Sequence, residues 1–350
     1  MIQKTVKFIF FTLLLVSSLA FTAVALAQRN NLSTGKILIA NRAAGTISVI
    51  DAASDQVVDT IALPAGNNPP EPMYVVYEQE SQRVYVGDRA NHRVMVFRAK
   101  DFSVEGVVST GQGVWHMWAH HKKKQLWVNN DVDSTTTVID TKSLQVVTTI
   151  PMPADLVGQG GKPHDIILDD EAAYITLVGL SGNNDYVLKF DRTSFQEVAR
   201  TPVGKDPHVI LTEKNDKLYV ASQNSNTVQV LKRSDLAQVA SIEVPGAHGV
   251  WIPQGSRVLY VTNLPNGGSD GLFTIDLASN TVIGEPVDTA FPTPHNLVAT
   301  QDGHRLYLTH SGADADKVTV YAISDKEPLP VPLGQITAGL NPFGLAFMPK

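Results

Sequence analysis

A short run of alternating apolar and polar residues recurs seven times along this chain of 350 residues. Each copy is followed by a polar loop and a second alternating run, such as residues 46–51 or 273–276. A third run and, after a Pro or Gly turn, a short fourth run complete each unit. The first runs of the seven units begin at Ile37, Val84, Leu126, Ala173, Leu218, Leu259 and Leu306.

Four short strands in each unit of about 45 residues, without the apolar spacing of an amphipathic helix, are typical of β-propeller blades. The sequence therefore predicts an all-β fold, a seven-bladed β-propeller that occupies residues 28–350 as a single domain. In the expected blade, the run at Ile37 corresponds to the second strand from the central channel, whereas residues 343–347 correspond to the innermost strand. We expect this C-terminal strand to join the N-terminal blade and close the ring, because an open array would leave a sheet edge exposed.

The first 27 residues have the pattern of a signal peptide. Lys4 and Lys7 precede an apolar stretch at residues 8–19, and the small residues Ala25 and Ala27 mark a cleavage site. We expect cleavage near Ala27 and a periplasmic or secreted protein, with no membrane span in the mature chain. The apolar stretch is shorter than the ~20 residues of a spanning helix, although an uncleaved anchor is an alternative.

Composition excludes several classes of protein. The chain has no Cys, which excludes disulfides, thiolate metal sites and a cysteine nucleophile. Its net charge of -6 lacks the basic excess of a nucleic-acid-binding protein, so we expect no nucleic-acid partner. The sequence also has no Gly-rich phosphate loop, no Gly-x-Ser-x-Gly elbow and no His-Glu-x-x-His motif.

One repeat unit carries the hallmark of a known family. Residues 259–263, Leu-Tyr-Val-Thr-Asn, are followed by a Thr-Ile-Asp strand at residues 274–276. In this the chain resembles the YVTN-type seven-bladed propellers over nearly its whole mature length. The resemblance implies the fold; it does not imply a function, because the motif is structural and the same fold serves many functions.

Half of the chain's ten histidines fall at one position of the repeat, the residue that follows the turn into the innermost strand. A Pro precedes this residue in five of the seven units, which sets the alignment independently of the histidines. Innermost strands line the central channel, so we expect five imidazoles to converge near one end of it. The seven aligned residues are Met73, His116, His164, His208, His248, His295 and Phe343.

The predicted ring of histidines favours a metal site, since neutral imidazole is the commonest protein metal ligand. Nitrogen ligands suit copper, iron or zinc, and the affinity order favours copper. The ring is similar in part to the propeller of nitrous oxide reductases, whose channel-facing histidines hold a copper cluster, and loosely to iron-dependent propeller oxygenases. It departs from a complete ring at Met73 and Phe343, and the chain lacks a Cys-bearing cupredoxin domain. The alternative is that Pro-His is a duplicated repeat consensus that binds only water.

The remaining candidates lie near the predicted mouth of the channel or in turns. His310 replaces the Asn of the repeat motif and is a candidate mouth residue, and Trp115, Trp118 and Trp251 flank ring histidines as candidate walls or core residues. Four further histidines lie in polar turns or loops that we expect to be solvated: His92, His120, His121 and His304.

The long irregular loops at residues 64–71, 154–162, 178–185 and 264–270 are expected on the histidine side of the ring. Long loops around one opening of a rigid scaffold usually carry function, so we expect this face to be the functional one. Two functions remain open. The first is an exported metal-dependent oxidoreductase, and the second is a non-catalytic propeller that binds a ligand, a metal ion or a partner protein at the loop-rich face. The sequence predicts neither a substrate nor a partner.

Overall fold

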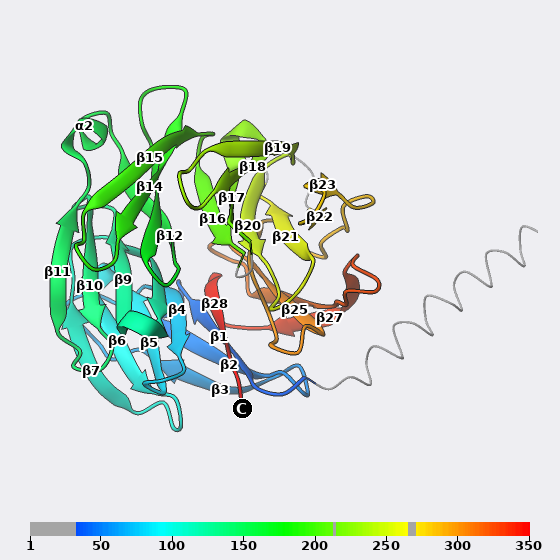
Figure 1. The fold of residues 1–350 in the computed structure, drawn as a ribbon. Helices are drawn as coiled ribbons and strands as arrows, with labels where there is room; N and C mark the ends of the chain where they lie inside the picture. Colours follow the sequence, from blue (N-terminus) through cyan, green and yellow to red (C-terminus); the bar gives the residue numbers. More distant parts are fainter. Residues whose placement is uncertain (1–32, 213–214, 265–270) are drawn as a thin grey trace, which may run out of the picture.

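The computed structural model describes residues 33–212, 215–264 and 271–350, and it confirms the predicted seven-bladed β-propeller (Figure 1). Seven four-stranded antiparallel sheets stand around a central axis, and the innermost strand of each sheet contacts the innermost strands of both neighbours. The predicted signal peptide, residues 1–27, lies outside the described residues, as do residues 265–270 of one long loop. No helix in the described ranges has the length and apolar character needed to cross a membrane.

In six of the blades, the four strands follow chain order from the axis outward. In the first blade, the C-terminal strand is innermost and the first three strands of the chain lie outside it. The first blade contains β28 (Pro342–Met348), β1 (Lys36–Asn41), β2 (Thr46–Asp51) and β3 (Gln56–Ala62). The second and third contain β4 (Pro72–Glu78), β5 (Arg83–Asp88), β6 (Arg93–Arg98) and β7 (Val104–Ser109), then β8 (Val114–His120), β9 (Gln125–Asn130), β10 (Thr135–Asp140) and β11 (Val146–Pro151). The fourth and fifth contain β12 (Lys162–Leu168), β13 (Ala172–Val178), β14 (Asp185–Asp191) and β15 (Glu197–Val203), then β16 (Pro207–Leu211), β17 (Lys217–Ser222), β18 (Thr227–Lys232) and β19 (Gln238–Glu243).

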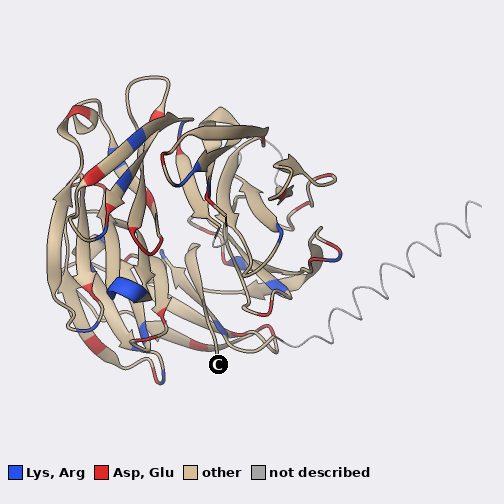
Figure 2. Cartoon of the chain, in the orientation of Figure 1, with Lys and Arg blue, Asp and Glu red and all other residues tan. Residues whose placement is uncertain are grey.

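The last two blades complete the ring. They contain β20 (Ala247–Trp251), β21 (Val258–Asn263), β22 (Gly271–Asp276) and β23 (Thr281–Val282), then β24 (Pro294–Ala299), β25 (Arg305–His310), β26 (Lys317–Ala322) and β27 (Val331–Thr337). Short helical turns lie between strands: η1 (Arg89–Asn91), η2 (His121–Lys123), α2 (Ala154–Val157) and η3 (Gln223–Ser225). Charged residues lie mainly at the turns and on outer strands such as β7 and β15 (Figure 2).

The ring closes as the sequence predicts. β28, the C-terminal strand, pairs antiparallel with β1, and Ile37 lies opposite Phe347. The first blade is therefore built from both ends of the chain, and its inner edge is covered. A sheet edge that is paired in this way presents no free backbone groups to another chain.

In five of the seven blades, a tyrosine of the second strand joins the blade to the next one along the chain. The Tyr85 hydroxyl donates to the carbonyl oxygen of Thr141 at 3.1 Å, and the Tyr260 hydroxyl donates to that of Pro328 at 2.9 Å. In each pair the acceptor belongs to the following blade, so the ring of the tyrosine fills the space between two sheets while its hydroxyl is satisfied. Equivalent hydrogen bonds are made by Tyr174, Tyr219 and Tyr307.

Candidate functional site

The innermost strands carry a β-bulge at the place where the sequence predicts the histidine ring. In β12, Pro163 pairs with Leu177 but Ile166 pairs with Ile175, so three steps on the inner strand face two on its neighbour. The same extra residue occurs in β4, β8, β20, β24 and β28, whereas β16 has none. A bulge leaves two adjacent side chains opposite one partner and re-aims them. Two successive residues of these strands can therefore face the axis.

This register corrects the sequence alignment in the third blade. The bulge of β8 lies between Val114 and Met117, so Val114 takes the place of the Pro and Trp115, not His116, takes the predicted ring position. The positive φ of Gly113, two residues before Trp115, matches that of Asp206, two residues before His208. We call this position the axial position; it is the first bulge residue in six blades and the equivalent residue of the unbulged strand β16. It is occupied by Met73, Trp115, His164, His208, His248, His295 and Phe343.

His116 reaches the axis from the second bulge residue. Ligand nitrogens of His116, His164 and His208 all lie within 4.8 Å of one another, which is the geometry of a metal-binding triad. His164 and His208 face each other with 3.0 Å between their Nε2 atoms. Three consecutive inner strands, β8, β12 and β16, therefore each supply one imidazole.

A carboxylate and a phenol hold His116 in place. Nδ1 of His116 lies 2.7 Å from Oδ1 of Asp165, and the Tyr74 hydroxyl lies 2.6 Å from Nε2. A carboxylate only accepts, so Nδ1 donates to Asp165 and Nε2 accepts from Tyr74. The other oxygen of Asp165 accepts from the backbone N–H of Val209 at 2.9 Å. A metal ion bound through Nε2 of His116 would replace the Tyr74 hydrogen bond.

The ionisation states suit a cation. Burial opposes the charged form of Asp165, but the neighbouring His116 and the hydrogen bonds to the carboxylate outweigh it and leave the pKa of Asp165 below its usual value. Burial lowers the pKa of His208 to about 4 and, together with the neighbouring imidazoles, lowers the pKa values of His164, His248 and His295. His164, His208, His248 and His295 are therefore neutral at pH 7, which is the form that ligates metals.

The other two ring histidines continue the row beside His208. Ring centroids of His208 and His248 are 3.9 Å apart, and those of His248 and His295 are 4.7 Å apart. The Asn296 amide nitrogen donates to Nδ1 of His295 at 2.7 Å. Both ring nitrogens of His248 are buried without a hydrogen-bond partner among the described residues. Unpaired buried nitrogens are costly, so His248 has unused ligating capacity.

Apolar and aromatic residues complete the row. Phe343 stacks 4.2 Å from His295, and Met73 is fully buried in the adjoining core. Trp115 lies 5.8 Å from His164 and under the guanidinium of Arg89 at 4.6 Å. These three residues occupy the axial positions that carry no histidine.

His310 lies elsewhere. It is fully buried inside its blade, where Nε2 meets the Thr319 hydroxyl at 2.7 Å and Nδ1 meets the Pro292 carbonyl oxygen at 3.1 Å. Its polar atoms are engaged within the blade, which gives it a structural role at the predicted mouth position.

A cavity of about 1080 Å³ occupies the channel on the other side of the triad. Its floor includes Tyr74, His116, Asp165 and His208, and it extends to the turns that join the innermost strands to the second strands. This end is opposite the long loops at residues 64–71 and 154–162 that precede the innermost strands, where the sequence analysis expected the functional face. Loop length therefore did not identify the face on which this cavity lies.

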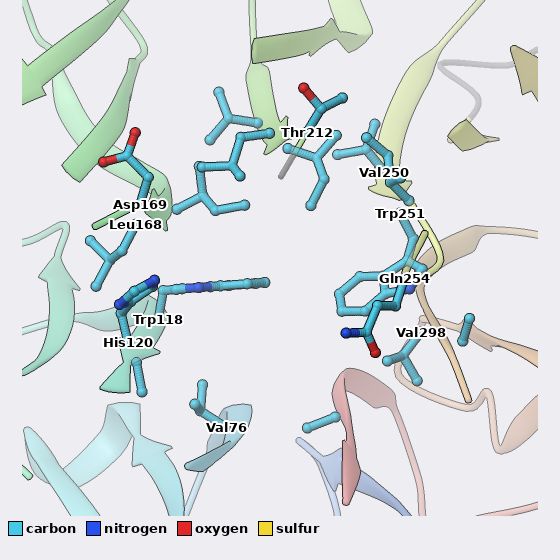
Figure 3. A pocket seen from close by; sticks show the side chains of 18 of the residues that line it. Val76, Trp118, His120, Leu168, Asp169, Thr212, Val250, Trp251, Gln254 and Val298 are labelled. Carbon is cyan, nitrogen blue, oxygen red and sulfur yellow. The ribbon is translucent and has the colours of Figure 1, made fainter. Parts of the chain in front are cut away.

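The cavity wall contains two of the candidate wall tryptophans and a histidine that the sequence assigned to a solvated turn (Figure 3). Trp118 and Trp251 both line it, with ring centroids 6.4 Å apart. His120, predicted to be a solvated turn residue, also lines it and is half-buried, and this burial and the charge of Arg192 lower its pKa to about 4. His92 and His121 are exposed as predicted, and His304 is half-buried in its turn.

Sequence reasoning missed Tyr74, Asp165 and Asn296. All three immediately follow an axial residue, and the bulge brings them to the channel. A polar residue directly after the ring position was the available signal, but an unbulged strand would turn it away from the axis.

Comparison with known proteins identifies the fold and a family. Residues 31–250 match the family model described as lactonase, 7-bladed beta-propeller. No curated protein matches the chain. Among solved structures, a putative 6-phosphogluconolactonase from Bacteroides fragilis is 14% identical, with a TM-score of 0.69 over 90% of this chain and 98% of the other.

Two further solved structures are similar. The periplasmic gluconolactonase of Pseudomonas aeruginosa is 16% identical, with a TM-score of 0.69 over 90% of this chain and 99% of that protein. A dihydro-heme d1 dehydrogenase in complex with DHE is 13% identical, with a TM-score of 0.62 over 89% of this chain and 75% of that one. At these identities the likeness concerns the fold alone.

Proposed function

The chain belongs to the seven-bladed β-propeller lactonase family, and we propose that it is an exported metal-dependent enzyme, an oxidoreductase, whose metal is held by His116, His164 and His208. The observation that carries this proposal is the convergence of three imidazoles whose ligand nitrogens lie within 4.8 Å of one another, two of which, His116 and His208, line the floor of a cavity. Nitrogen-only ligands favour copper, with iron or zinc as alternatives. A bound copper ion would supply one-electron exchange with a substrate.

The chain's own residues would prepare this site. The Asp165 carboxylate fixes the orientation and tautomer of His116, as carboxylates behind metal-ligating histidines commonly do. Tyr74 places a hydroxyl beside His116, where it can donate a proton to a polar group in the cavity. His248 and His295 extend the row of nitrogens beyond the triad and are the residues that would hold a second ion.

Metal content of triad variants tests the proposal. We expect wild-type protein loaded with copper and then dialysed to retain the metal. His208→Ala should weaken binding by far more than tenfold, and Asp165→Asn should weaken it by roughly 10–100-fold, the loss typical of a group behind a ligand. His304→Ala is the matched control, because His304 lies in a turn of the seventh blade away from the triad. Elemental analysis gives metal per protein, and circular dichroism checks the fold.

The same measurement defines the outcome that contradicts the proposal. Equal metal content in His208→Ala and His304→Ala would show that the triad is not the site. Wild-type protein that retains no metal would favour the non-catalytic alternative, a propeller that binds a ligand or partner protein.

Lactone hydrolysis is a second candidate function. It is favoured by the 2.7 Å pair of His116 and Asp165, because a carboxylate-oriented imidazole can act as a general base toward water. The solved gluconolactonases named above are relatives in fold only. Hydrolysis of a sugar lactone that survives complete removal of metal, and is lost in His116→Gln, would favour this candidate over the oxidoreductase.

Export through residues 1–27 belongs to the same proposal. The charged start, the apolar stretch and Ala25 and Ala27 support it, as does the word periplasmic in the description of the Pseudomonas aeruginosa protein. N-terminal sequencing of the exported product should begin at Gln28, and a sequence that begins at Met1 would contradict cleavage.

A further inference from the structure

The cavity beyond the triad has an apolar wall that is open on its inner side. Val76, Leu211 and Val250 are only half-buried although they lie on innermost strands, because each contributes to the lining of the channel. Water in contact with such a wall gains few hydrogen bonds, so its displacement by an apolar surface is favourable. The wall therefore suits a ligand with an apolar body.

Two indoles point toward each other in this space, with their ring planes tilted by 45° (Figure 3). Trp118 comes from β8 in the third blade and Trp251 from β20 in the sixth, and each packs on its other side against hydrophobic core. Both keep a half-exposed surface toward the cavity. Side chains fixed from behind and open in front present flat, preorganised faces, which bind aromatic rings by stacking or edge contacts.

Three of the four carboxylates around the mouth form ion pairs, and the fourth, Asp216, accepts a hydrogen bond from the Ser234 hydroxyl. Asp169 accepts from the Tyr174 hydroxyl at 3.0 Å and forms an ion pair with Arg233 at 3.3 Å. Asp170 forms an ion pair with Lys122, and Glu171 does so with Lys123. Because these charges offset one another, the mouth selects for neither anions nor cations.

Lys189 keeps its positive charge, which the carboxylate of Asp216 on the same lining offsets, and His120 adds no charge. The Nζ of Lys189 donates to the carbonyl oxygens of Arg233 and Ser234 at 2.8 and 3.0 Å. His120 is neutral at pH 7 because burial lowers its pKa. The mouth therefore admits a neutral molecule.

The floor is the polar part of the cavity. It offers Tyr74, His116 and His208, and Nδ1 of His208 is buried without a partner among the described residues. A ligand whose ring lies against the exposed faces of the two indoles would direct a polar group toward this floor. We infer that the cavity binds a neutral aromatic molecule with one small polar head, such as a phenol, with the ring at Trp118 and Trp251 and the head at the floor.

This inference rests on the proposed function only where it assigns the polar head of the ligand to a metal-bound floor. Binding of the aromatic ring at Trp118 and Trp251 does not depend on a metal. The first test therefore uses metal-free protein and two probes of the same skeleton, 2-naphthol and its saturated form decahydro-2-naphthol. We expect calorimetry to show at least tenfold tighter binding of 2-naphthol. Trp118→Leu with Trp251→Leu should abolish this preference, because leucine retains apolar surface but cannot stack.

Two controls keep this test decisive. Val132→Ala, at an exposed residue of the third blade, should leave the preference unchanged. Trp118→Phe with Trp251→Phe should retain most of it, which separates a stacking role from simple packing. If the leucine variants fail to fold, quenching of wild-type tryptophan fluorescence by acrylamide decides, since bound 2-naphthol should protect the channel indoles. Equal binding of both probes, or no protection, would overturn the inference.

The second test compares 2-naphthol with naphthalene in copper-loaded protein. We expect the hydroxyl to add at least tenfold in affinity in wild type and much less in His208→Ala. Copper retention without any binding of 2-naphthol would overturn the inference and leave the metal proposal intact. Binding of 2-naphthol by a protein that retains no copper would overturn the metal proposal and support the aromatic site.

Discussion

The protonation state of the imidazoles at the axial position follows from their burial in the channel. Burial removes water from the charged form, and each neighbouring imidazole adds repulsion if it is protonated as well. The group thus stays neutral in folded protein at pH values where an exposed histidine would be half protonated. The metal-binding form is therefore present without a prior loss of protons.

Stability of the metal-free protein should fall as the pH drops from 6.5 to about 4. The folded pKa of His208 is lowered to about 4, below that of the unfolded chain, so the unfolded chain binds more protons in this window. The stabilising contribution is complete above pH 6.5 and is lost as the pH falls through the window. Urea denaturation at pH 7, 6, 5 and 4.5 measures the free energy of unfolding.

Removing one imidazole should flatten this pH profile. His248→Phe eliminates a buried titrating group and should reduce the slope by up to about 1.4 kcal/mol per pH unit. His121→Gln, at an exposed histidine, should leave the slope unchanged. A profile that is flat in wild type would show that these histidines titrate normally. Asp165, whose pKa is lowered, affects stability only below about pH 4.

The repeat in the sequence allowed the ring histidines to be predicted, but not the residues that contact them. His164, His208, His248 and His295 could be placed at the channel because the repeat sets their position. Asp165 and Tyr74 could not, since a regular strand would aim them into the blade. His120 was misplaced because its turn is polar, and polarity does not show which side of a hairpin faces the cavity.

At the scale of the element, the β-bulge of the innermost strands brings the side chains of the candidate site together. One extra residue lets two adjacent side chains reach the axis, so the triad draws on both bulge positions. Strand number and order could be predicted because the apolar pattern repeats with the blade. The register of each bulge could not, and the alignment of His116 was wrong by one residue for that reason.

The bulge of β20 depends on Gly249. A Cβ there would lie 2.0 Å from the carbonyl oxygen of His295, so the neighbouring innermost strand leaves no space for a side chain. We expect Gly249→Ala to destabilise the protein by roughly 3 kcal/mol, the upper part of the usual range for overpacking. Thermal unfolding measures this.

The matched control is Gly334→Ala on the outer strand β27, where a Cβ would meet no atom within 4 Å. It should leave the melting temperature nearly unchanged. If both variants melt alike, the close approach of β20 and β24 does not constrain the ring.

At the scale of the whole molecule, the seven blades form one cooperative ring. Tyrosine hydroxyls connect consecutive blades, and Tyr307 of the seventh blade reaches Asp55 of the first at 2.6 Å. The number of blades and the closure of the ring by β28 could both be predicted from strand phase. The cavity and the face on which it lies could not, because they depend on how the seven innermost strands are spaced around the axis.

Deleting residues 341–350 should open the ring. The deletion removes β28, exposes the edge of β1 and uncovers apolar residues such as Ile37 and Ile39. We expect loss of soluble protein or a large drop in melting temperature, measured by size-exclusion chromatography and calorimetry. Deleting only residues 349–350, which follow β28, should be tolerated. An unchanged melt of the longer deletion would show that closure by β28 is dispensable.

Pairing of β1 with β28 also sets when this chain can finish folding. Its partners lie roughly 300 residues apart, so the loop-closure entropy for that one contact is on the order of 5 kcal/mol. Contacts within the other blades are far shorter in sequence and form at lower entropic cost. β1 therefore lacks its innermost neighbour until β28 has been brought to it from the far end of the fold. Completion of the first blade is thus expected to be a late and slow step of folding, after the other six blades have formed.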